Sequence, residues 1–156
     1  MKRSWKLWLL IVFFFWVAVK TGSSIYRPEQ VADFTLLSSL GFGVMFYMLN
    51  IPIAAMELAT AYLLFSKKAK AFVFGYIACA LEVFNGIIVT VVSMMNSDKL
   101  KEIYVAIREA RGIPAKAQDF GFLMTPMGMA SMLFIYILFY IAIILALKKV
   151  KKELVR

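Results

Sequence analysis

The sequence predicts an all-α integral membrane protein, a bundle of four transmembrane helices with both chain ends on the cytoplasmic side. Of its 156 residues, 63% are hydrophobic and 17% are charged, whereas soluble domains carry about 25% charged residues. The apolar residues form runs long enough to cross a hydrocarbon core. Lysines and arginines gather at the ends of these runs, which is a topology signal and not a nucleic-acid-binding face. We therefore expect the lipid bilayer as a partner and no nucleic acid.

The first predicted span covers residues 5–21. Its apolar core, Leu7 to Val19, has 13 residues, which also fits the apolar part of a secretory signal peptide. The following residues, Lys20 to Ser24, lack the small-residue pattern of a cleavage site. A retained short span is therefore favoured, and a cleaved signal is the alternative.

The second predicted span covers residues 42–65. The apolar run from Phe34 to Phe65 has 32 residues, which is too long for one perpendicular span. Pro28 fits a helix start, so residues 28–40 are predicted to form an interfacial helix or a helical extension. Gly41 and Gly43 would allow the chain to bend before the span begins.

Two more spans follow, at residues 71–95 and 125–147. A tight basic turn at residues 66–70 joins the second span to the third. The segment 96–121 is predicted to lie outside the hydrocarbon core and to contain an amphipathic surface helix, because apolar residues recur there at helical spacing. Thr125 and Pro126 form a good start for the last span. The chain is expected to be a single transmembrane domain, residues 1–156.

The distribution of basic residues predicts the orientation. One side of the membrane would hold 11 lysines and arginines and the other side 7. Because the cytoplasmic side carries the excess, both chain ends are predicted to be cytoplasmic. The plasma (inner) membrane is the expected location.

The second and third spans each carry a glutamate where an ionised group is costly. Glu57 lies 10 residues before Lys67, or about 15 Å along a helix, and Glu82 lies 12 residues after Lys70, or about 18 Å. Both acids therefore lie near the middle of a core about 30 Å thick. Because a short turn joins the two helices, they should be antiparallel neighbours with the acids at matched depth.

Asn50 and Asn85 are predicted to join this acid pair. Asn50 shares a helix face with Glu57, and Asn85 shares one with Glu82. Two adjacent acids cannot easily both ionise, and no basic residue is expected within the spans to neutralise them, because Lys6 and Lys20 lie toward the ends of the first span and can snorkel. The pair could hold a proton, bind a small cation, or hydrogen-bond the polar head of an amphiphilic ligand. The sequence therefore predicts a ligand- or proton-binding site of Glu57, Glu82, Asn50 and Asn85, in a protein that binds or transports such a species.

Other functions stay open. Intramembrane polar groups also hold helices together, so the chain could be an accessory or assembly subunit, with a membrane protein partner or further copies of itself. The two glutamates could also act as acid and base in an enzyme acting on a lipid-soluble substrate. A non-enzymatic role is favoured, because phosphate-binding and nucleophile motifs are missing.

No cofactor or metal is expected. The chain has no histidine and one cysteine, which removes the commonest haem and zinc ligands. Methionines near the ends of the spans, with Cys79, could handle copper(I), but adaptable packing is the more common role of methionine. Four aromatic residues of the last span are expected to face lipid or another subunit: Phe134, Tyr136, Phe139 and Tyr140.

Overall fold

Helices build the part of the chain that the structure, a computed structural model, describes: residues 4–114, 117–151 and 154. Within it, four helices are long and apolar enough to cross a membrane: α1 (Trp5–Tyr26), α3 (Gly43–Phe65), α4 (Ala71–Met95) and α6 (Pro126–Val150). The shorter α5 (Ser97–Ala110) lies between the third and fourth of them. The predicted fold class, a four-span integral membrane protein with a short helix before the last span, is confirmed.

Helix α1 is an integral part of the bundle and is longer than predicted. It continues to Tyr26 instead of ending near residue 21. Ser4 begins it, because its side-chain oxygen accepts a hydrogen bond from the Leu7 N–H (3.2 Å). Apolar side chains at helical spacing face inward, Leu7, Leu10, Phe14 and Val17 among them. Helix α1 packs more extensively on α3 than any other two elements pack on each other.

The connection from α1 to α3 is not one continuous helix from Pro28 to Leu40. A 3-10 turn, η1 (Pro28–Gln30), comes first, and α2 (Ala32–Ser39) follows it. Val31 separates them because its backbone is extended, with φ −108° and ψ 119°. Gly41 then turns the chain with φ 84°, which glycine adopts without steric cost. Helix α3 starts at Gly43 and is continuous past Pro52.

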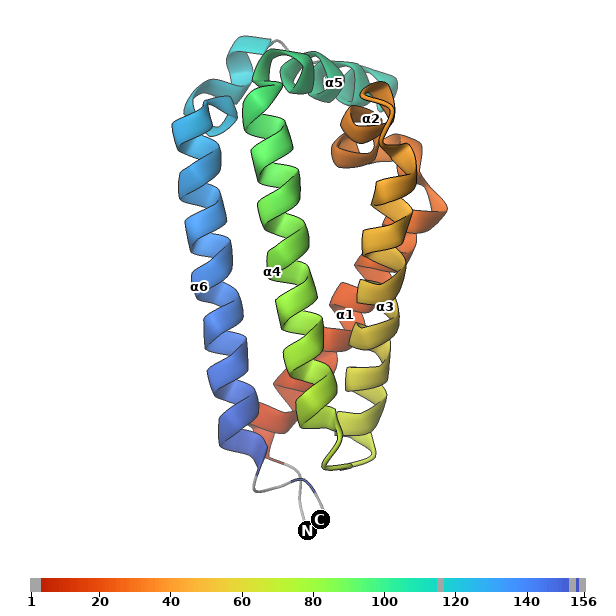
Figure 1. Ribbon diagram of the computed structural model, residues 1–156, viewed down its shortest axis with the longest axis vertical. Coiled ribbons are helices and arrows are strands. Elements are labelled where there is room, and N and C mark those ends of the chain that lie inside the picture. Colours follow the sequence, from red (N-terminus) through yellow and green to blue (C-terminus); the bar gives the residue numbers. More distant parts are fainter. Residues whose placement is uncertain (1–3, 115–116, 152–153, 155–156) are drawn as a thin grey trace.

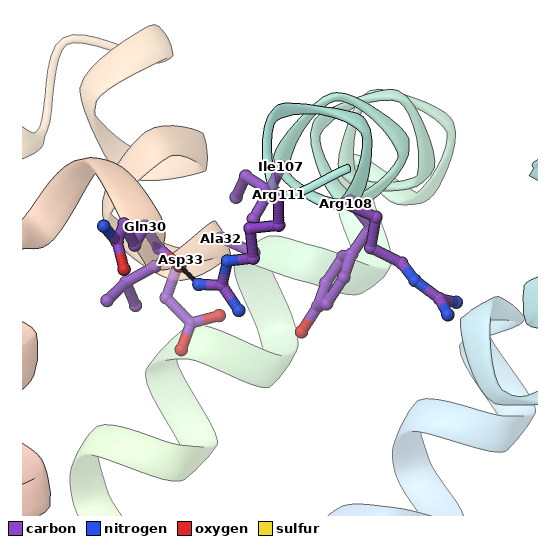
Figure 2. Close-up of a pocket in the computed structure, with 8 residues that line it drawn as sticks. Gln30, Ala32, Asp33, Ile107, Arg108 and Arg111 are labelled. Carbon is purple, nitrogen blue, oxygen red and sulfur yellow. Dashed lines mark hydrogen bonds between the residues drawn. The ribbon is translucent and has the colours of Figure 1, made fainter. Parts of the chain in front are cut away.

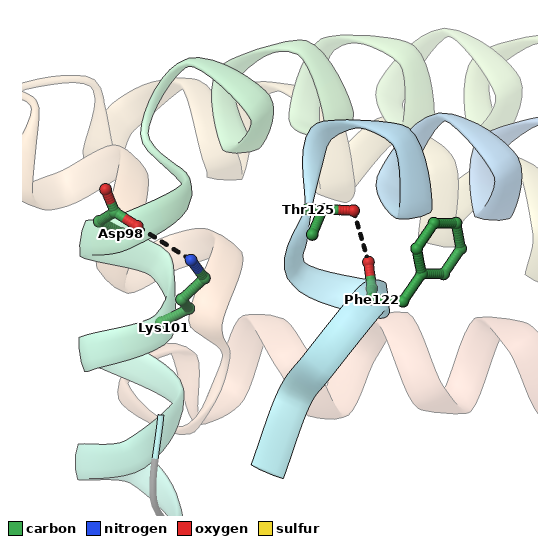
Figure 3. Close-up of polar contacts among 4 residues, drawn as sticks. All are labelled: Asp98, Lys101, Phe122 and Thr125. Atoms are coloured by element: carbon green, nitrogen blue, oxygen red, sulfur yellow. Dashed lines mark hydrogen bonds and ion pairs between the residues drawn. The ribbon is translucent and has the colours of Figure 1, made fainter. Parts of the chain in front are cut away.

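The start of α6 follows the predicted cap. The Thr125 hydroxyl oxygen accepts a hydrogen bond from the Gly128 N–H (3.1 Å), and the hydroxyl donates to the Phe122 carbonyl oxygen (2.7 Å). Figure 3 shows this contact beside the exposed ion pair of Asp98 and Lys101 on α5 (2.9 Å). The turn before α6 is η2 (Ala117–Met124), and residues 115–116 of the predicted extramembrane segment lie outside the described residues.

The long helices pack in the order α1, α3, α4, α6. The start of α1, the turn after α3 and the end of α6 lie at one end of the molecule, and α2 and α5 cover the other end (Figure 1). Leu7, Leu64, Ala71 and Val150 belong to one core cluster at the first end. The assignment of that end to the cytoplasmic side rests on the charge count and stays a prediction.

A second core cluster lies under α2 and α5. Its buried members are Ala32, Leu36, Leu100 and Met129. Helices α4 and α6 therefore contribute to an apolar cluster toward each end, whereas α1 and α3 contribute only to the first. The candidate site lies between these clusters.

Candidate functional site

Glu57 and Glu82 come together inside the bundle. Their residues are 1% and 8% exposed, and their carboxyl groups are close enough to hydrogen-bond to each other. The short turn between α3 and α4 makes these helices adjacent, with Lys67 in a left-handed conformation (φ 53°). A hydrogen bond between two carboxyl groups requires a proton on one of them.

Hydroxyl groups from the first and last spans, α1 and α6, form hydrogen bonds with this acid pair. The Thr21 hydroxyl of α1 lies 3.2 Å from Oε2 of Glu57 and 3.0 Å from the Val17 carbonyl oxygen, so it can donate to either. The Tyr136 hydroxyl of α6 donates to Oε2 of Glu82 over 2.7 Å. All four long helices therefore contribute a polar side chain to one buried cluster.

The expectation that four aromatic residues of the last span face outward is wrong for two of them. Phe134 and Phe139 are exposed, but Tyr140 is buried and Tyr136 reaches Glu82. The rings of Tyr136 and Tyr140 pack together with centroids 4.8 Å apart. The sequence signal was available, because these tyrosines are four residues apart and share a helix face, but spacing alone does not say which face is buried.

Gly86 allows Tyr136 to approach α4. A Cβ atom at Gly86 would lie 2.8 Å from Cε1 of the Tyr136 ring, which is shorter than van der Waals contact. The missing side chain thus leaves room for the ring, and the ring carries its hydroxyl to Glu82. Gly86 is part of the construction of the site.

A cavity of about 830 Å³ lies between the two core clusters, with Glu82 in its wall. This volume falls within the range of small-molecule sites, about 300–1,000 Å³. Phe13 and Tyr140 line it toward one cluster, and Leu100 and Met129 line it toward the other. Most of the lining surface is apolar, but polar side chains from all four spans also line the cavity, among them Thr21, Asn50, Glu82, Asn85, Thr90, Ser93 and Tyr136.

Asn50 and Asn85 line this cavity together with Glu82. The Asn50 amide nitrogen donates one hydrogen bond to the Phe46 carbonyl oxygen (2.8 Å), which leaves its second N–H and its amide oxygen for other contacts. The amide oxygen of Asn85 is buried and without a hydrogen-bond partner. Three of the four predicted site residues therefore line one cavity. Glu57 is not part of its lining, and it contacts the cavity through Glu82.

The cavity opens toward the lipid between α1 and α6. Trp16 of α1 and Ile135 and Phe139 of α6 line it. These same residues are 61%, 59% and 47% exposed. Side chains that both line a cavity and face outward mark its mouth, so the opening lies on the side of the bundle that faces hydrocarbon.

Lys20 corrects the expectation that no basic residue lies within the spans. Lys20 is within the predicted first span, and because α1 extends to Tyr26, it lies about a turn and a half inside the helix end, one residue before Thr21. It lines the cavity, and its charge acts on both Glu57 and Asp33. Its ammonium group lies 5.9 Å from the centroid of the Trp16 ring on the exposed side of α1. The acid pair is therefore not isolated from positive charge, although this cation faces the mouth.

A second pocket, of about 420 Å³, lies between α2 and α5 at the end of the molecule. Figure 2 shows Arg111 reaching across it to Gln30, whose carbonyl oxygen accepts a hydrogen bond from Nη2 of Arg111 (3.0 Å), while Arg108 points away. Asp33 and Tyr104 line both this pocket and the larger cavity. These two residues form the outer wall of the cavity.

Asp33 is outside the spanning helices, and the pKa of its carboxyl group differs from the ordinary value. Burial raises the pKa of its carboxyl above the ordinary value, and the charge of Lys20 opposes that change. Burial and the negative charge of Asp33 also raise the pKa of the Tyr104 phenol. The outer wall thus has a titratable group that the sequence did not single out.

The soft-metal hypothesis gains no geometric support. Cys79 is buried in the cluster toward the turn after α3. Met124 and Met129 belong to the opposite cluster, and Met48 and Met95 are 70% and 80% exposed. The structure does not bring the thiol and these thioethers together.

Comparisons with protein-family models, with curated proteins and with solved structures found no match to this chain. The cavity and its side chains therefore carry the functional interpretation by themselves.

Proposed function

We propose that this protein binds an amphiphilic molecule from the bilayer in the cavity between α1 and α6. The polar head lies at Glu82 and Asn85, and the apolar part lies against the walls from Phe13 to Met129. The observation that carries this proposal is a mostly apolar cavity that ends at a buried carboxyl group and opens toward lipid. A water-filled path for a cation would need a more polar lining.

Each predicted site residue has a role in this function. Glu82 and Asn85 contact the head, and Asn50 orients it from α3. Glu57 shares a proton with Glu82, so that the pair avoids two adjacent charges. The Thr21 and Tyr136 hydroxyls fix the two carboxyl groups before the ligand arrives, which lowers the cost of ordering them on binding.

The test uses a fatty alcohol with a photoreactive diazirine on its chain, added to the purified protein in phosphatidylcholine nanodiscs. We expect saturable labelling at lining residues of α1 and α6. Val89→Trp places a large side chain in the cavity and should remove the labelling. Val91→Trp is the matched control, because Val91 is on the same helix, is 47% exposed and is not part of the lining.

Equal labelling of both tryptophan variants would contradict the proposal. The accessory-subunit alternative predicts a different result, a stoichiometric protein partner in native mass spectrometry of gently extracted material. The enzyme alternative predicts chemical turnover of the bound molecule that Glu57→Gln or Glu82→Gln removes. Labelling without turnover, blocked by Val89→Trp alone, supports binding.

A further inference from the structure

The inner end of the cavity, at Glu82 and Asn85, presents a buried hydrogen-bond acceptor that has no donor in the protein. Glu82 offers carboxyl oxygens, and Asn85 offers a buried amide oxygen that has no partner. The Asn50 amide nitrogen donates one of its two N–H groups to the Phe46 carbonyl oxygen, and its amide oxygen is a further acceptor for a ligand. A buried acceptor without a donor is destabilising, so a ligand that supplies a donor gains binding free energy at this position.

The two hydroxyl donors that hold the acid pair are already engaged inside the protein. The Tyr136 hydroxyl donates to Glu82 over 2.7 Å. The Thr21 hydroxyl lies within hydrogen-bond distance of Glu57 and of the Val17 carbonyl oxygen. A ligand head that only accepts hydrogen bonds would have to compete with these contacts.

The charges near the inner end also discriminate between heads. An anionic head would lie beside Glu82 and Glu57, where like charges repel. Lys20 is the cation that could offset this, but its ammonium group is over the Trp16 ring, on the exposed side of α1. An anionic head is therefore repelled by the two glutamates at the inner end, and this repulsion cancels any attraction by Lys20 at the mouth.

We infer that the ligand belongs to the class of long-chain or polycyclic apolar molecules whose head donates hydrogen bonds, an alcohol or an amine, and not a carboxylate or a phosphate. This inference rests on the proposed function, because it names the head that the cavity selects. An alcohol donates its O–H to Glu82 or Asn85. An amine donates N–H groups to both acceptors, and as an ammonium ion it adds charge attraction to the carboxylate.

The test is competition by four probes that share a 14-carbon chain: tetradecylamine, tetradecanol, methyl tetradecyl ether and tetradecanoate. Each competes with the diazirine alcohol in nanodiscs, and its potency is expressed per mole fraction in the bilayer, which removes differences in partitioning. We expect the alcohol and the amine to compete at least tenfold more strongly than the ether, because the ether has no donor. The carboxylate should be as weak as the ether or weaker.

Two variants test which residues cause the preference for a head that donates hydrogen bonds. Asn85→Leu should weaken the alcohol and the amine about tenfold and leave the ether unchanged. Glu82→Gln keeps an acceptor and removes the charge, so the amine should lose its advantage over the alcohol. Glu109→Gln on the exposed face of α5 is the matched control and should change nothing.

The outcomes separate this inference from the proposed function. Equal competition by the ether and the alcohol would overturn donor selection, while loss of labelling in Val89→Trp would still support the cavity as the binding site. A carboxylate that competes best, and loses that advantage in Lys20→Met, would place an anionic head at the mouth and would also overturn the inference. The probe series on the unaltered protein gives this answer even if a variant fails to fold.

Discussion

The two ends of the cavity both contain buried acids, but they hold them in different ways. At the inner end, Glu57 and Glu82 are fixed by hydroxyl donors and by each other. At the outer wall, Asp33 lies in reach of the charge of Lys20 and lines a pocket with Arg111. The inner end is thus built from directional hydrogen bonds, whereas the outer wall holds a carboxyl group that burial disfavours and a nearby cation favours.

This difference indicates what each end can do. Hydrogen bonds at a buried site have strict geometry and reward a ligand that completes them. A charge that burial disfavours is instead readily neutralised by protonation. The inner end is therefore suited to binding a ligand head, whereas the outer wall holds a group whose contribution to stability depends on pH.

The largest expected effect comes from disturbing the inner end through Gly86. Gly86→Ala would place a methyl group 2.8 Å from the Tyr136 ring, so the ring must shift and its hydroxyl leaves Glu82. We expect about tenfold weaker tetradecanol competition, as for loss of a hydrogen bond to a charged group worth about 1.5–3 kcal/mol. Competition against the diazirine alcohol measures this.

Gly22→Ala is the matched control. Gly22 is also in a spanning helix, and a Cβ atom there would meet nothing within 4 Å. Alanine should strengthen that helix by up to about 1 kcal/mol and leave binding unchanged. If Gly86→Ala behaves like Gly22→Ala in both binding and thermal unfolding, Tyr136 does not need the space at Gly86.

An intermediate effect is expected when one inner hydrogen bond is removed without a change in shape. Tyr136→Phe deletes the donor 2.7 Å from Glu82. We expect a loss of about 1–2 kcal/mol in stability, seen as a lower apparent unfolding temperature in nanodiscs. Tyr62→Phe, at a residue 68% exposed, should leave this temperature within error. An unchanged temperature in Tyr136→Phe would mean that the Glu82 carboxyl is held by other groups.

The smallest effect belongs to the outer wall and depends on pH. Burial raises the pKa of Asp33 above 3.8, so the folded protein binds protons more tightly there than the unfolded chain does. Stability from such a group falls as pH rises through its folded-state pKa. Asp33→Asn should therefore unfold at a temperature a few degrees higher than the parent at pH 8, and the difference should shrink as pH falls toward about 4.

Asp98→Asn provides the comparison for that measurement, because Asp98 is exposed and pairs with Lys101 at the surface. Its unfolding temperature should stay close to that of the parent at every pH. If Asp33→Asn lowers the unfolding temperature at pH 8, the attraction of Lys20 outweighs burial, and the outer wall would be a true ion-pair site.

Much of the architecture could be predicted from the sequence because the bilayer restricts it. Long apolar runs must become helices that satisfy their own backbone hydrogen bonds, so the number of spans and the helical segment after the third follow from composition and spacing. The meeting of Glu57 and Glu82 was also predictable, because a short turn fixes two antiparallel helices and residue counting fixes depth. The break in the helix at Val31 could not be predicted, because it depends on where α2 packs against α5.

The sequence by itself determined the four spans and the buried acid pair, since hydrophobic length and a short turn are local properties. Only the tertiary structure decided which side chains meet that pair. Thr21 lies 36 residues before Glu57, and Tyr136 lies 54 residues after Glu82. Their contacts depend on helix rotation and on the space at Gly86, which arise when four helices pack together. The cavity itself has the same origin, because it is the volume that two separate core clusters leave between them.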